Sequence, residues 1–417
     1  MNIFGVQFLG KNFGMPSREV GVCHESADKH TEIREVLRRF QNGYTERNIE
    51  NVDAFMEELF INGEEICVLG TGTGELFLGS EQVKNLIRDD WKYWGDASID
   101  WENAHISVKG EVAWFATMGH VKYTFADSLE RYDRYLDLIK DKSEEKERTP
   151  KERVAFINWV LSLTYHQRVE SEREYLWPLC LSGVLLKDGN KWRIAHLQFS
   201  IQKANFPDER FENSKEHLEN YNKQNAITDG YKNNQMTLEL KDLLKKLETE
   251  LIGQKDISKK LISKYFAADS MPYIIGPENQ WYYGIDQIRD FFAKSSDANL
   301  ILDLEHAIAS RSDEVTWVTV TGMLKQVLNE DKLAESALEE LNNLFQTNLT
   351  SKEKLFAAHR SMAYVLKESA AGANYTCPIR LTSVISNISE GYAFQHIHFS
   401  FPFYWILEGK LDGISEH

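Results

Sequence analysis

Residues 378–400 read PIRLTSVISNISEGYAFQHIHFS, and they give the strongest signal of fold in this chain of 417 residues. The stretch has the pattern of two strands joined by a short turn, which predicts a β-hairpin. A near copy, PLCLSGVLLKDGNKWRIAHLQFS, occupies residues 178–200. The histidines that mark the two second strands, His196 and His396, are separated by a fixed interval (396 − 196 = 200). The repetition predicts that one fold occurs twice along the chain.

Other local matches keep nearly the same interval and extend the repeat over most of the chain. Val112-Ala113-Trp114 matches Val315-Thr316-Trp317 (317 − 114 = 203), and residues 149–152 match residues 350–353 (350 − 149 = 201). In each copy the apolar pattern predicts two helices, a hairpin, a third helix, two long strands, a helical insertion and the closing hairpin. The length of the chain also favours two domains over one core.

The predicted boundaries follow the polar segments. An irregular N-terminal segment covers 1–30, the first domain 31–204, a polar linker 205–236 and the second domain 237–408. Long strands are predicted at 99–108, 112–125, 300–309 and 315–327. Helical insertions are predicted at 128–172, 331–345 and 352–367.

Composition and charge limit the partners. The hydrophobic content of 42% is enough for well-packed cores, and the net charge of −16 argues against nucleic acid or an anionic membrane as a partner. No uncharged run of about 18 apolar residues is present, so we expect no membrane span. The N-terminus shows no basic start followed by an apolar run, so we expect no signal peptide.

The four cysteines are scattered and form no CxxC pair; they are Cys23, Cys67, Cys180 and Cys377. That distribution favours buried thiols in a reducing compartment over a disulfide framework or a zinc site. We therefore expect a cytoplasmic protein.

The last hairpin of the second repeat carries a recognisable motif. Its final strand has His396, His398 and Ser400 in the pattern H-x-H-x-S, and the preceding strand has Arg380 and Thr382 in the pattern R-x-T. With the order of helices, hairpin, helix and four long strands, this motif resembles the nuclear-transport-factor-2-like superfamily. Within it the likeness is to the SnoaL-like group, which includes the association domain of calcium/calmodulin-dependent kinase II.

The first repeat matches this motif in part. It has Trp192, His196 and Ser200, but it departs from the motif at Cys180 and Gln198. The resemblance implies an α+β fold of two tandem cystatin-like cones. Each cone would be a bent antiparallel sheet wrapped around helices, with a helical insertion before the last hairpin. The superfamily includes enzymes, ligand binders and oligomerisation hubs, so the fold alone does not choose among these functions.

Strand periodicity gives the candidate ligand site, because residues two apart on a strand share one face. Arg380 with Thr382, and His396 with His398, are therefore expected to face the cavity of the second cone. A buried arginine there would bind an anion in bidentate fashion, and histidine would donate, accept or transfer a proton. The other candidate ligand-binding residues are Trp317, Trp114 and His196. The alternative is that these groups satisfy each other and buried backbone, or pair with acidic residues of the other domain.

Several residues have a structural interpretation that is favoured over a functional one. Trp114 and Trp317 are expected to pack in the core, and His105 and His306 to make structural hydrogen bonds. The Gly70–Gly74 run lacks the GxGxxG spacing and is expected to be a hairpin turn. Two histidines on one strand face are too few for a metal site, so we expect no metal and no cofactor.

Three function classes remain open. The leading hypothesis is non-catalytic binding of a small anionic or aromatic molecule in the cone cavity, mainly that of the second domain. The first alternative is a lyase, isomerase or cyclase that uses acid–base chemistry in the same cavity. The second alternative is a structural assembly module with vestigial cavities. A carboxylate beside the histidines would favour the enzyme, and cavities filled by their own side chains would favour assembly.

We also expect the two repeats to pair with each other through the outer faces of their sheets, as an intramolecular pseudo-dimer that can associate further. The residues assigned to the outward faces are Phe115, Val121, Val318 and Val320. Exposing two such apolar faces to water would be unfavourable, which is the reason for expecting the contact.

Overall fold

The chain contains two separate seven-stranded sheets with helices, an α+β architecture, in this computed structural model. The structure describes residues 24–72, 74–126, 172–201, 215–267, 270–277, 279–295, 298–327, 330–348, 374–388 and 391–402. Of the expected irregular segment 1–30, residues 1–23 lie outside the described residues, and residues 24–30 are helical, as the start of α1. Most of the insertions, including 127–171 and 349–373, also lie outside the described residues.

The first half begins with helices and closes with long strands. Its elements are α1 (His24–Glu46), η1 (Ile49–Asn51), α2 (Val52–Leu59), β1 (Cys67–Leu69), β2 (Leu76–Leu78), α3 (Ser80–Tyr93), β3 (Asp96–Ile99), β4 (His105–Lys109), β5 (Val112–Ala126), β6 (Glu172–Asp188) and β7 (Lys191–Ile201). The strand order is β2-β1-β7-β6-β5-β3, and β4 also pairs with β5. We call this the first sheet.

The second half repeats that order. Its elements are α7 (Leu238–Lys246), η4 (Leu247–Leu251), α8 (Lys259–Tyr265), β8 (Tyr273–Ile275), β9 (Trp281–Tyr283), α9 (Gly284–Lys294), β10 (Ala298–Leu302), β11 (Ile308–Ser312), β12 (Val315–Val327), α10 (Glu330–Phe345), β13 (Asn374–Ile388) and β14 (Gly391–Ser400). The second sheet has the order β10-β12-β13-β14-β8-β9, with β11 also on β12, so its topology matches that of the first sheet.

The segment expected as a linker contains one further helix, α6 (Lys215–Asp229). Near the end of this helix Ile227, and just beyond it Tyr231, pack against a small apolar cluster. The cluster combines the β1–β2 hairpin with Ile308 of β11, so the linker covers a point where the two halves meet.

Helix formation follows the local sequence. The predicted apolar stripe of α1, at Ile33, Leu37 and Phe40, is buried in the core of the first half. Thr237 and Ser258 are the N-caps of α7 and α8, where each side chain accepts a hydrogen bond from a backbone N–H of the first turn.

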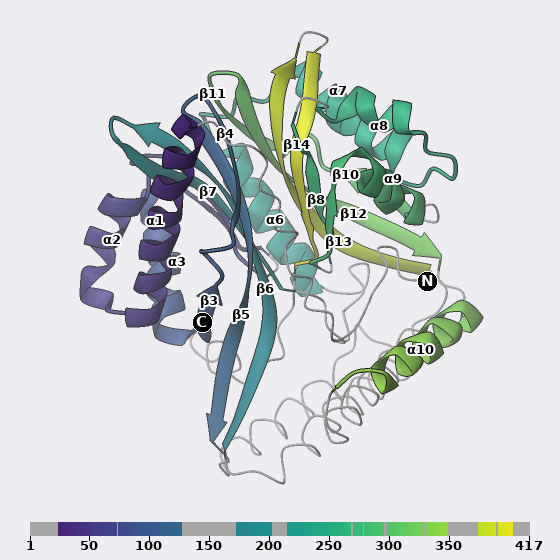
Figure 1. Ribbon diagram of the computed structural model, residues 1–417, viewed down its shortest axis with the longest axis horizontal. Helices are drawn as coiled ribbons and strands as arrows, with labels where there is room; N and C mark the ends of the chain where they lie inside the picture. The colour runs from purple at the N-terminus through teal and green to yellow at the C-terminus, as the bar shows by residue number, and fades with distance from the viewer. Residues whose placement is uncertain are drawn as a thin grey trace.

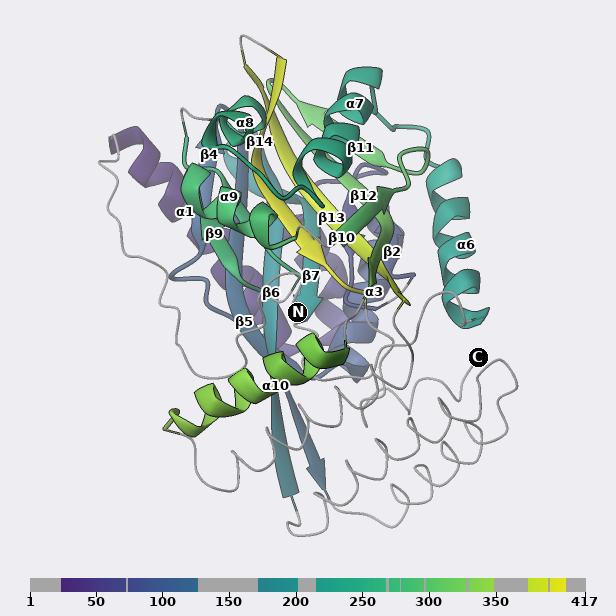
Figure 2. The same ribbon diagram turned by 90° about the vertical axis from the view of Figure 1, so that its right-hand side faces the viewer.

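The two sheets pack face to face, and the helices cover their far sides. Figure 1 shows α1, α2 and α3 outside the first sheet, and α7, α8 and α9 outside the second. Turned by 90°, Figure 2 shows β13 and β14 running obliquely over β5 and β6. Between the sheets lies an apolar cluster with members from both halves, including Trp114, Val184, Trp317 and Val384. We call this contact the interface.

The expected contact between the sheets is present, but the residues assigned to it were wrong. Phe115 and Val121 lie in the core of the first half, and Val318 and Val320 lie in the core of the second. Side chains alternate along a strand, so an assignment displaced by one residue exchanges the two faces. The interface face of β5 and β12 is the one that carries Trp114 and Trp317.

Two of the expected long strands are interrupted. Residues 99–108 form β3 and β4 with a turn between them, and residues 300–309 form β10 and β11 in the same way. In the first turn the Asp100 carboxylate accepts from the backbone N–H of Asn103, and the Asp100 carbonyl accepts from the Thr117 hydroxyl. These side-chain bonds replace strand pairing locally, which the apolar pattern alone does not reveal.

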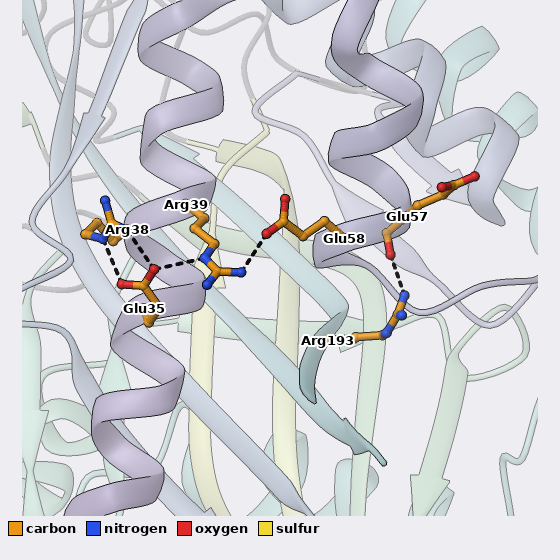
Figure 3. Close-up of polar contacts among 6 residues, drawn as sticks. All are labelled: Glu35, Arg38, Arg39, Glu57, Glu58 and Arg193. Atoms are coloured by element: carbon orange, nitrogen blue, oxygen red, sulfur yellow. Dashed lines mark hydrogen bonds and ion pairs between the residues drawn. The ribbon is translucent and has the colours of Figure 1, made fainter. Parts of the chain in front are cut away.

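Polar contacts fasten α2 to the first sheet on its outer side (Figure 3). Arg193 of β7 donates to the backbone carbonyl of Glu57 at 2.6 Å and to that of Phe60 at 3.1 Å. Nearby, Glu35 bonds Arg38 and Arg39, and Arg39 also reaches Glu58. These ion pairs are half exposed, so they contribute little to stability, whereas Arg193 satisfies carbonyls at the end of a helix.

Gly119 and Gly322 provide a test of the shared topology. A Cβ at Gly119 would lie 2.1 Å from the Ser98 carbonyl oxygen, and one at Gly322 would lie 2.4 Å from that of Ile301. We predict that Gly119→Ala and Gly322→Ala each lower the free energy of unfolding by about 1–3 kcal/mol, because neighbouring backbone must move. Urea unfolding measures the change.

Gly230→Ala is the control, because the nearest atoms there would lie at an ordinary 3.5 Å. Equal stability of the Gly119 and Gly230 variants would contradict the close strand approach.

Candidate functional site

The candidate residues of the last hairpin share one face, as the strand pattern predicted. In the register of β13 and β14, Arg380 lies opposite Ser400, and Thr382 lies opposite His398. That face is directed at the first sheet and not into the second cone. The neighbouring Leu381, Ile397 and Phe399 occupy the core of the second half, so alternation directs the polar residues to the interface.

His398 joins the two sheets through hydroxyl groups. Its Nδ1 lies 2.7 Å from the Ser182 Oγ, and its Nε2 lies 2.8 Å from the Ser200 Oγ. The Ser200 hydroxyl donates its proton to the Asn279 Oδ1, so Ser200 accepts from Nε2–H of His398. Nδ1 is then the acceptor for the Ser182 hydroxyl. This chain of bonds fixes one neutral tautomer of a fully buried imidazole.

Gln198, His196 and Thr382 also have hydrogen-bond partners across the interface, whereas the ring nitrogens of His396 have none among the described residues. The Gln198 amide donates to the His398 carbonyl at 3.2 Å and to the Ser400 Oγ at 3.0 Å. His196 Nε2 lies 2.9 Å from the Thr382 Oγ1. Bonds between the halves therefore satisfy much of the polar surface that the sheets bury.

His396 lies in a stack of rings. Its imidazole is 4.2 Å from the Tyr273 ring, measured between centroids, and Tyr273 stacks in turn on Trp281. His105 of the first sheet contacts the same Tyr273 edge-on at 4.5 Å. The stack is an aromatic contact between the halves, with one histidine from each sheet.

The interface histidines are uncharged at neutral pH. Burial lowers the pKa of His196 and of His396 to about 3, and that of His105 to about 4. Burial, with smaller contributions from His396 and Arg380, lowers the pKa of His398 well below its usual value. A carboxylate hydrogen-bonded to His396 or His398 was the feature expected of an acid–base enzyme. In the described part of the chain, neither histidine has such a bond.

Arg380 is buried in a turn of the other half. Its Nη2 donates to the Gly70 carbonyl at 2.6 Å and its Nη1 to the Gly72 carbonyl at 3.1 Å. Burial lowers the pKa of Arg380 to about 10, and the negative charge of Glu75 opposes that shift. This geometry agrees with the structural alternative given for Arg380 in the sequence analysis. Arg380 bonds buried backbone carbonyls and lies near an acidic residue of the other half.

The glycine run forms the β1–β2 turn, and its composition has a steric reason. A Cβ at Gly70 would lie 2.3 Å from the Glu75 carboxylate, and one at Gly72 would lie 2.7 Å from it. The Glu75 carboxylate also accepts from the Gly72 N–H at 2.5 Å. Glycine is needed because Glu75 lies directly over the backbone that receives Arg380.

The remaining candidates have structural surroundings. Trp114 and Trp317 pack between the sheets, and their indole N–H groups have no hydrogen-bond partner. His306 Nδ1 lies 2.7 Å from the Asp303 carboxylate, which is the structural hydrogen bond expected for it. The described residues hold no group of three or more His, Cys, Asp or Glu side chains placed to bind a metal.

The interior of the first cone contains a polar and aromatic group that sequence reasoning missed. The Tyr44 hydroxyl of α1 donates to the Asp90 carboxylate of α3 at 2.9 Å. The Tyr44 ring meets Trp91 edge-on, and Phe199 of β7 lies between Tyr44 and Trp94. The indole N–H groups of Trp91 and Trp94 are buried and have no hydrogen-bond partner within the described part of the chain.

Local sequence accounts for this group. Gly43 on α1 leaves room for Phe55 and Trp91, since a Cβ there would lie 2.2 Å from the Phe55 ring. Helix α3 has 14 residues, whereas α9 has 11. Trp91 lies in the last turn of α3, and Trp94 is its C-cap residue. The sequence of α9 contains no tryptophan. This difference between the two halves was the sequence feature from which the group could have been predicted.

The interior of the second cone is filled by phenylalanine rings. Phe291 contacts Phe292 at 5.1 Å and Phe399 at 5.6 Å, and Phe266 contacts Phe292 and Phe394. All are fully buried, so this interior packs as an ordinary core. The two cones therefore differ in chemistry although they share a topology.

A SnoaL-like domain model matches residues 33–135. The match confirms the predicted SnoaL-like resemblance and covers most of the described α1–β5 segment. No curated protein sequence matches the chain. No helix in the described ranges has the length and apolar character needed to cross a membrane.

Solved structures give similar folds at low identity. A nuclear transport factor 2-like superfamily protein from Salmonella enterica is 13% identical, with 43% of this chain and 92% of that chain covered and a TM-score of 0.25. An NTF2-like protein of unknown function from Pseudomonas putida is 10% identical, with 45% and 94% covered and a TM-score of 0.25. A protein with a cystatin-like fold from Caulobacter vibrioides is 12% identical, with 39% and 87% covered and a TM-score of 0.25. At these values the likenesses support no statement about function.

The neutral interface histidines predict a loss of stability in acid. Their folded-state pKa lies near 3, against 6.5 for the free side chain, so below pH 6.5 the unfolded chain binds protons first. Stability should be independent of these groups above pH 6.5 and should fall as the pH drops from 6.5 toward 3. In His396→Gln, we expect the loss between pH 6 and pH 5 to be smaller by about 1 kcal/mol. Urea unfolding at each pH measures the difference.

His120→Gln is the control, because it replaces a histidine of β5 that is exposed and lies outside the buried interface group. If both variants follow the wild-type curve, His396 is not held neutral by burial.

Proposed function

We propose that the chain is a tandem pair of SnoaL-like cones that binds, without catalysis, a small aromatic molecule with a hydrogen-bond acceptor in the first cone. Two domains, 31–204 and 237–408, would pair inside one chain as a pseudo-dimer. The ligand would lie among Tyr44, Trp91, Trp94 and Phe199.

The tandem arrangement is supported by the equal topology of the sheets and by equal details within them. Both β6–β7 and β13–β14 shift register at the same point, after Val184 and after Val384. Both β1 and β8 pair in parallel with the last strand of their sheet, opposite His196 and His396. Shared irregularities of this kind are best explained by duplication of one domain.

The observation that carries the binding proposal is the pair of unsatisfied indole N–H groups in the first cone. Trp91 and Trp94 are 5% and 8% exposed, and neither N–H has an acceptor among the residues that the structure describes. A buried donor without a partner costs free energy, and a ligand acceptor would recover it. The rings around these donors would stack on an aromatic ligand. In the second cone the described core contains Tyr265, whose hydroxyl bonds Glu250, and otherwise phenylalanine and aliphatic residues, with no tryptophan. The lack of an indole donor among these described residues favours a structural role for that cone.

Tyr44 supports binding over catalysis. Burial raises its pKa well above the usual value, and the neighbouring Asp90 adds to the shift. The hydroxyl thus stays protonated and bonds to Asp90, as an orienting donor would. The runner-up, an acid–base enzyme, would rest on this same Tyr44–Asp90 pair, and a pH-dependent turnover lost in Tyr44→Phe would favour it.

A cytoplasmic location without nucleic-acid or membrane partners is part of the proposal. Its support is the acidic composition and the free, buried thiols of Cys67 and Cys180. Burial raises the pKa of the Cys67 thiol to about 12, so this cysteine behaves as a packing residue.

The test uses 8-anilinonaphthalene-1-sulfonate, an aromatic anion, as the probe. We expect saturable binding to the wild-type chain, weakened about tenfold or more in Trp91→Phe or Trp94→Phe, because a hydrogen bond to a charged acceptor is lost. Fluorescence titration gives the affinities, and spectra of ¹⁵N-labelled tryptophan show which indole N–H signals move.

Trp317→Phe is the matched control, since its indole N–H is also buried and unpartnered but lies in the interface. It should bind the probe as the wild type does. Equal weakening in all three variants, or no shift of the Trp91 and Trp94 signals, would reject the first cone as the binding site.

A further inference from the structure

Arg47 joins the ends of two helices that contribute to the proposed ligand site. It follows the last residue of α1, and its guanidinium reaches the end of α3. The Arg47 Nε donates to the Trp91 carbonyl at 2.9 Å. Its Nη2 donates to the carbonyls of Asp90 at 2.7 Å and Trp94 at 2.5 Å. Backbone carbonyls at the end of a helix lack donors from a following turn, so this side chain supplies bonds that α3 itself does not.

The three carbonyls belong to residues that define the site. Trp91 and Trp94 carry the indole N–H groups that have no acceptor among the described residues, and Asp90 accepts from the Tyr44 hydroxyl. Trp91 lies in the last turn of α3, and Trp94 is its C-cap residue. Both therefore lie where a helix is held by few bonds of its own. Arg47 fixes the backbone from which both indole donors extend.

The guanidinium of Arg47 is occupied by contacts within the protein. Its Nη1 donates to the Asp96 carboxylate at 2.9 Å in an ion pair. With the three carbonyl bonds, four of the five guanidinium N–H groups have described partners. The side chain is 21% exposed, so these contacts largely cover it. Arg47 therefore bonds the end of α3 and has little capacity left to bond a ligand itself.

The backbone of Arg47 has an unfavourable conformation for an arginine. Its φ is 51°, in the left-handed region that favours glycine. A residue in this region commonly ends a helix, and glycine usually occupies the position. A helix needs no side chain there in order to end. The presence of arginine is therefore explained by what its guanidinium contacts.

The second half ends the corresponding helix with glycine. Gly253, with a φ of 77°, lies just after α7 and η4, and its backbone N–H bonds the Ser295 carbonyl at 3.2 Å. Ser295 is the C-cap residue of α9, as Trp94 is of α3. The same two helix ends are thus joined by backbone in the second half and by the Arg47 side chain in the first. The arginine occurs in the half whose third helix ends in tryptophans.

We propose that Arg47 is a positioning residue for the ligand site of the first cone. By bonding the end of α3, it holds the indole N–H groups of Trp91 and Trp94 in place for a ligand acceptor. A lysine would keep the charge beside Asp96, but it would not reproduce the planar fork that bonds three carbonyls. The inference rests on the proposed function, and it assigns a role to a residue outside the proposed ligand contacts.

The first measurement is made without ligand. Spectra of ¹⁵N-labelled tryptophan, assigned with Trp91→Phe and Trp94→Phe, report the surroundings and the order of each indole N–H. In Arg47→Lys and in Arg47→Gly, we expect the Trp91 and Trp94 signals to shift or broaden while the other indole signals keep their positions. Arg47→Gly removes the unfavourable φ, so a loss of order in that variant cannot come from backbone strain. Unchanged Trp91 and Trp94 signals in both variants would overturn the proposal.

The second measurement is the 8-anilinonaphthalene-1-sulfonate titration of the same variants. We expect the affinity to fall about tenfold in Arg47→Lys and in Arg47→Gly, because a displaced indole donor no longer bonds the probe. Arg193→Lys is the matched control, since Arg193 also donates to carbonyls at a helix end, those of Glu57 and Phe60 after α2. It should lower the melting temperature and leave the affinity unchanged, because α2 contributes none of the proposed ligand residues.

The outcomes separate the two proposals. Arg47 variants that lose stability but keep the wild-type affinity, as the control does, would overturn the positioning role and leave the binding site in place. A wild-type chain that does not bind the probe would reject the proposed function. The spectra recorded without ligand would then decide by themselves whether Arg47 holds the two indole groups.

Discussion

The burial of Arg380 is the interaction on which much of the rest depends. A guanidinium group that is 1% exposed needs hydrogen-bond acceptors and a nearby negative charge, and the β1–β2 turn supplies both. Those acceptors are presented only when the two sheets face each other. The same contact covers Trp114 and Trp317 and orders the bonds of His398. Removing the contact would therefore expose both an apolar surface and a buried polar network in a single step.

The sequence allowed the repeat, the element order and the shared face of Arg380 with Thr382 and of His396 with His398 to be predicted, because each leaves a local pattern. It did not allow the two faces of each sheet to be distinguished. In Val112-Ala113-Trp114-Phe115 every residue is apolar, because one face meets helices and the other meets a second sheet. A strand buried on both sides shows no alternation, so Arg380 and His398 were assigned to a cone interior. The Tyr44–Asp90 pair was missed for another reason, since its members lie on separate helices and only the fold brings them together.

The two cones illustrate how one topology supports different interiors. Both place helices against the concave side of a bent sheet, and both bury large aromatic rings there. In the second half most of those rings are phenylalanines in mutual contact, with Tyr265 at the edge of the group bonded to Glu250. In the first half the longer α3 adds indole donors next to a bonded tyrosine. The described interiors of the two halves therefore differ in the indole donors, which are present in the first half alone.

Because the two halves belong to one chain, a substitution in evolution affects their contact differently from a substitution in a dimer of identical chains. In such a dimer, a substitution appears twice in the contact at once, so an arginine must be compatible with two turns simultaneously. In one continuous chain the same substitution appears once. Tethering also keeps the effective concentration of the partner high, so a partly weakened contact still forms while its second residue changes. In a single chain, Arg380 and Glu75 can therefore be acquired with one part of the contact altered at a time, whereas in a symmetric dimer each substitution alters both copies of that part.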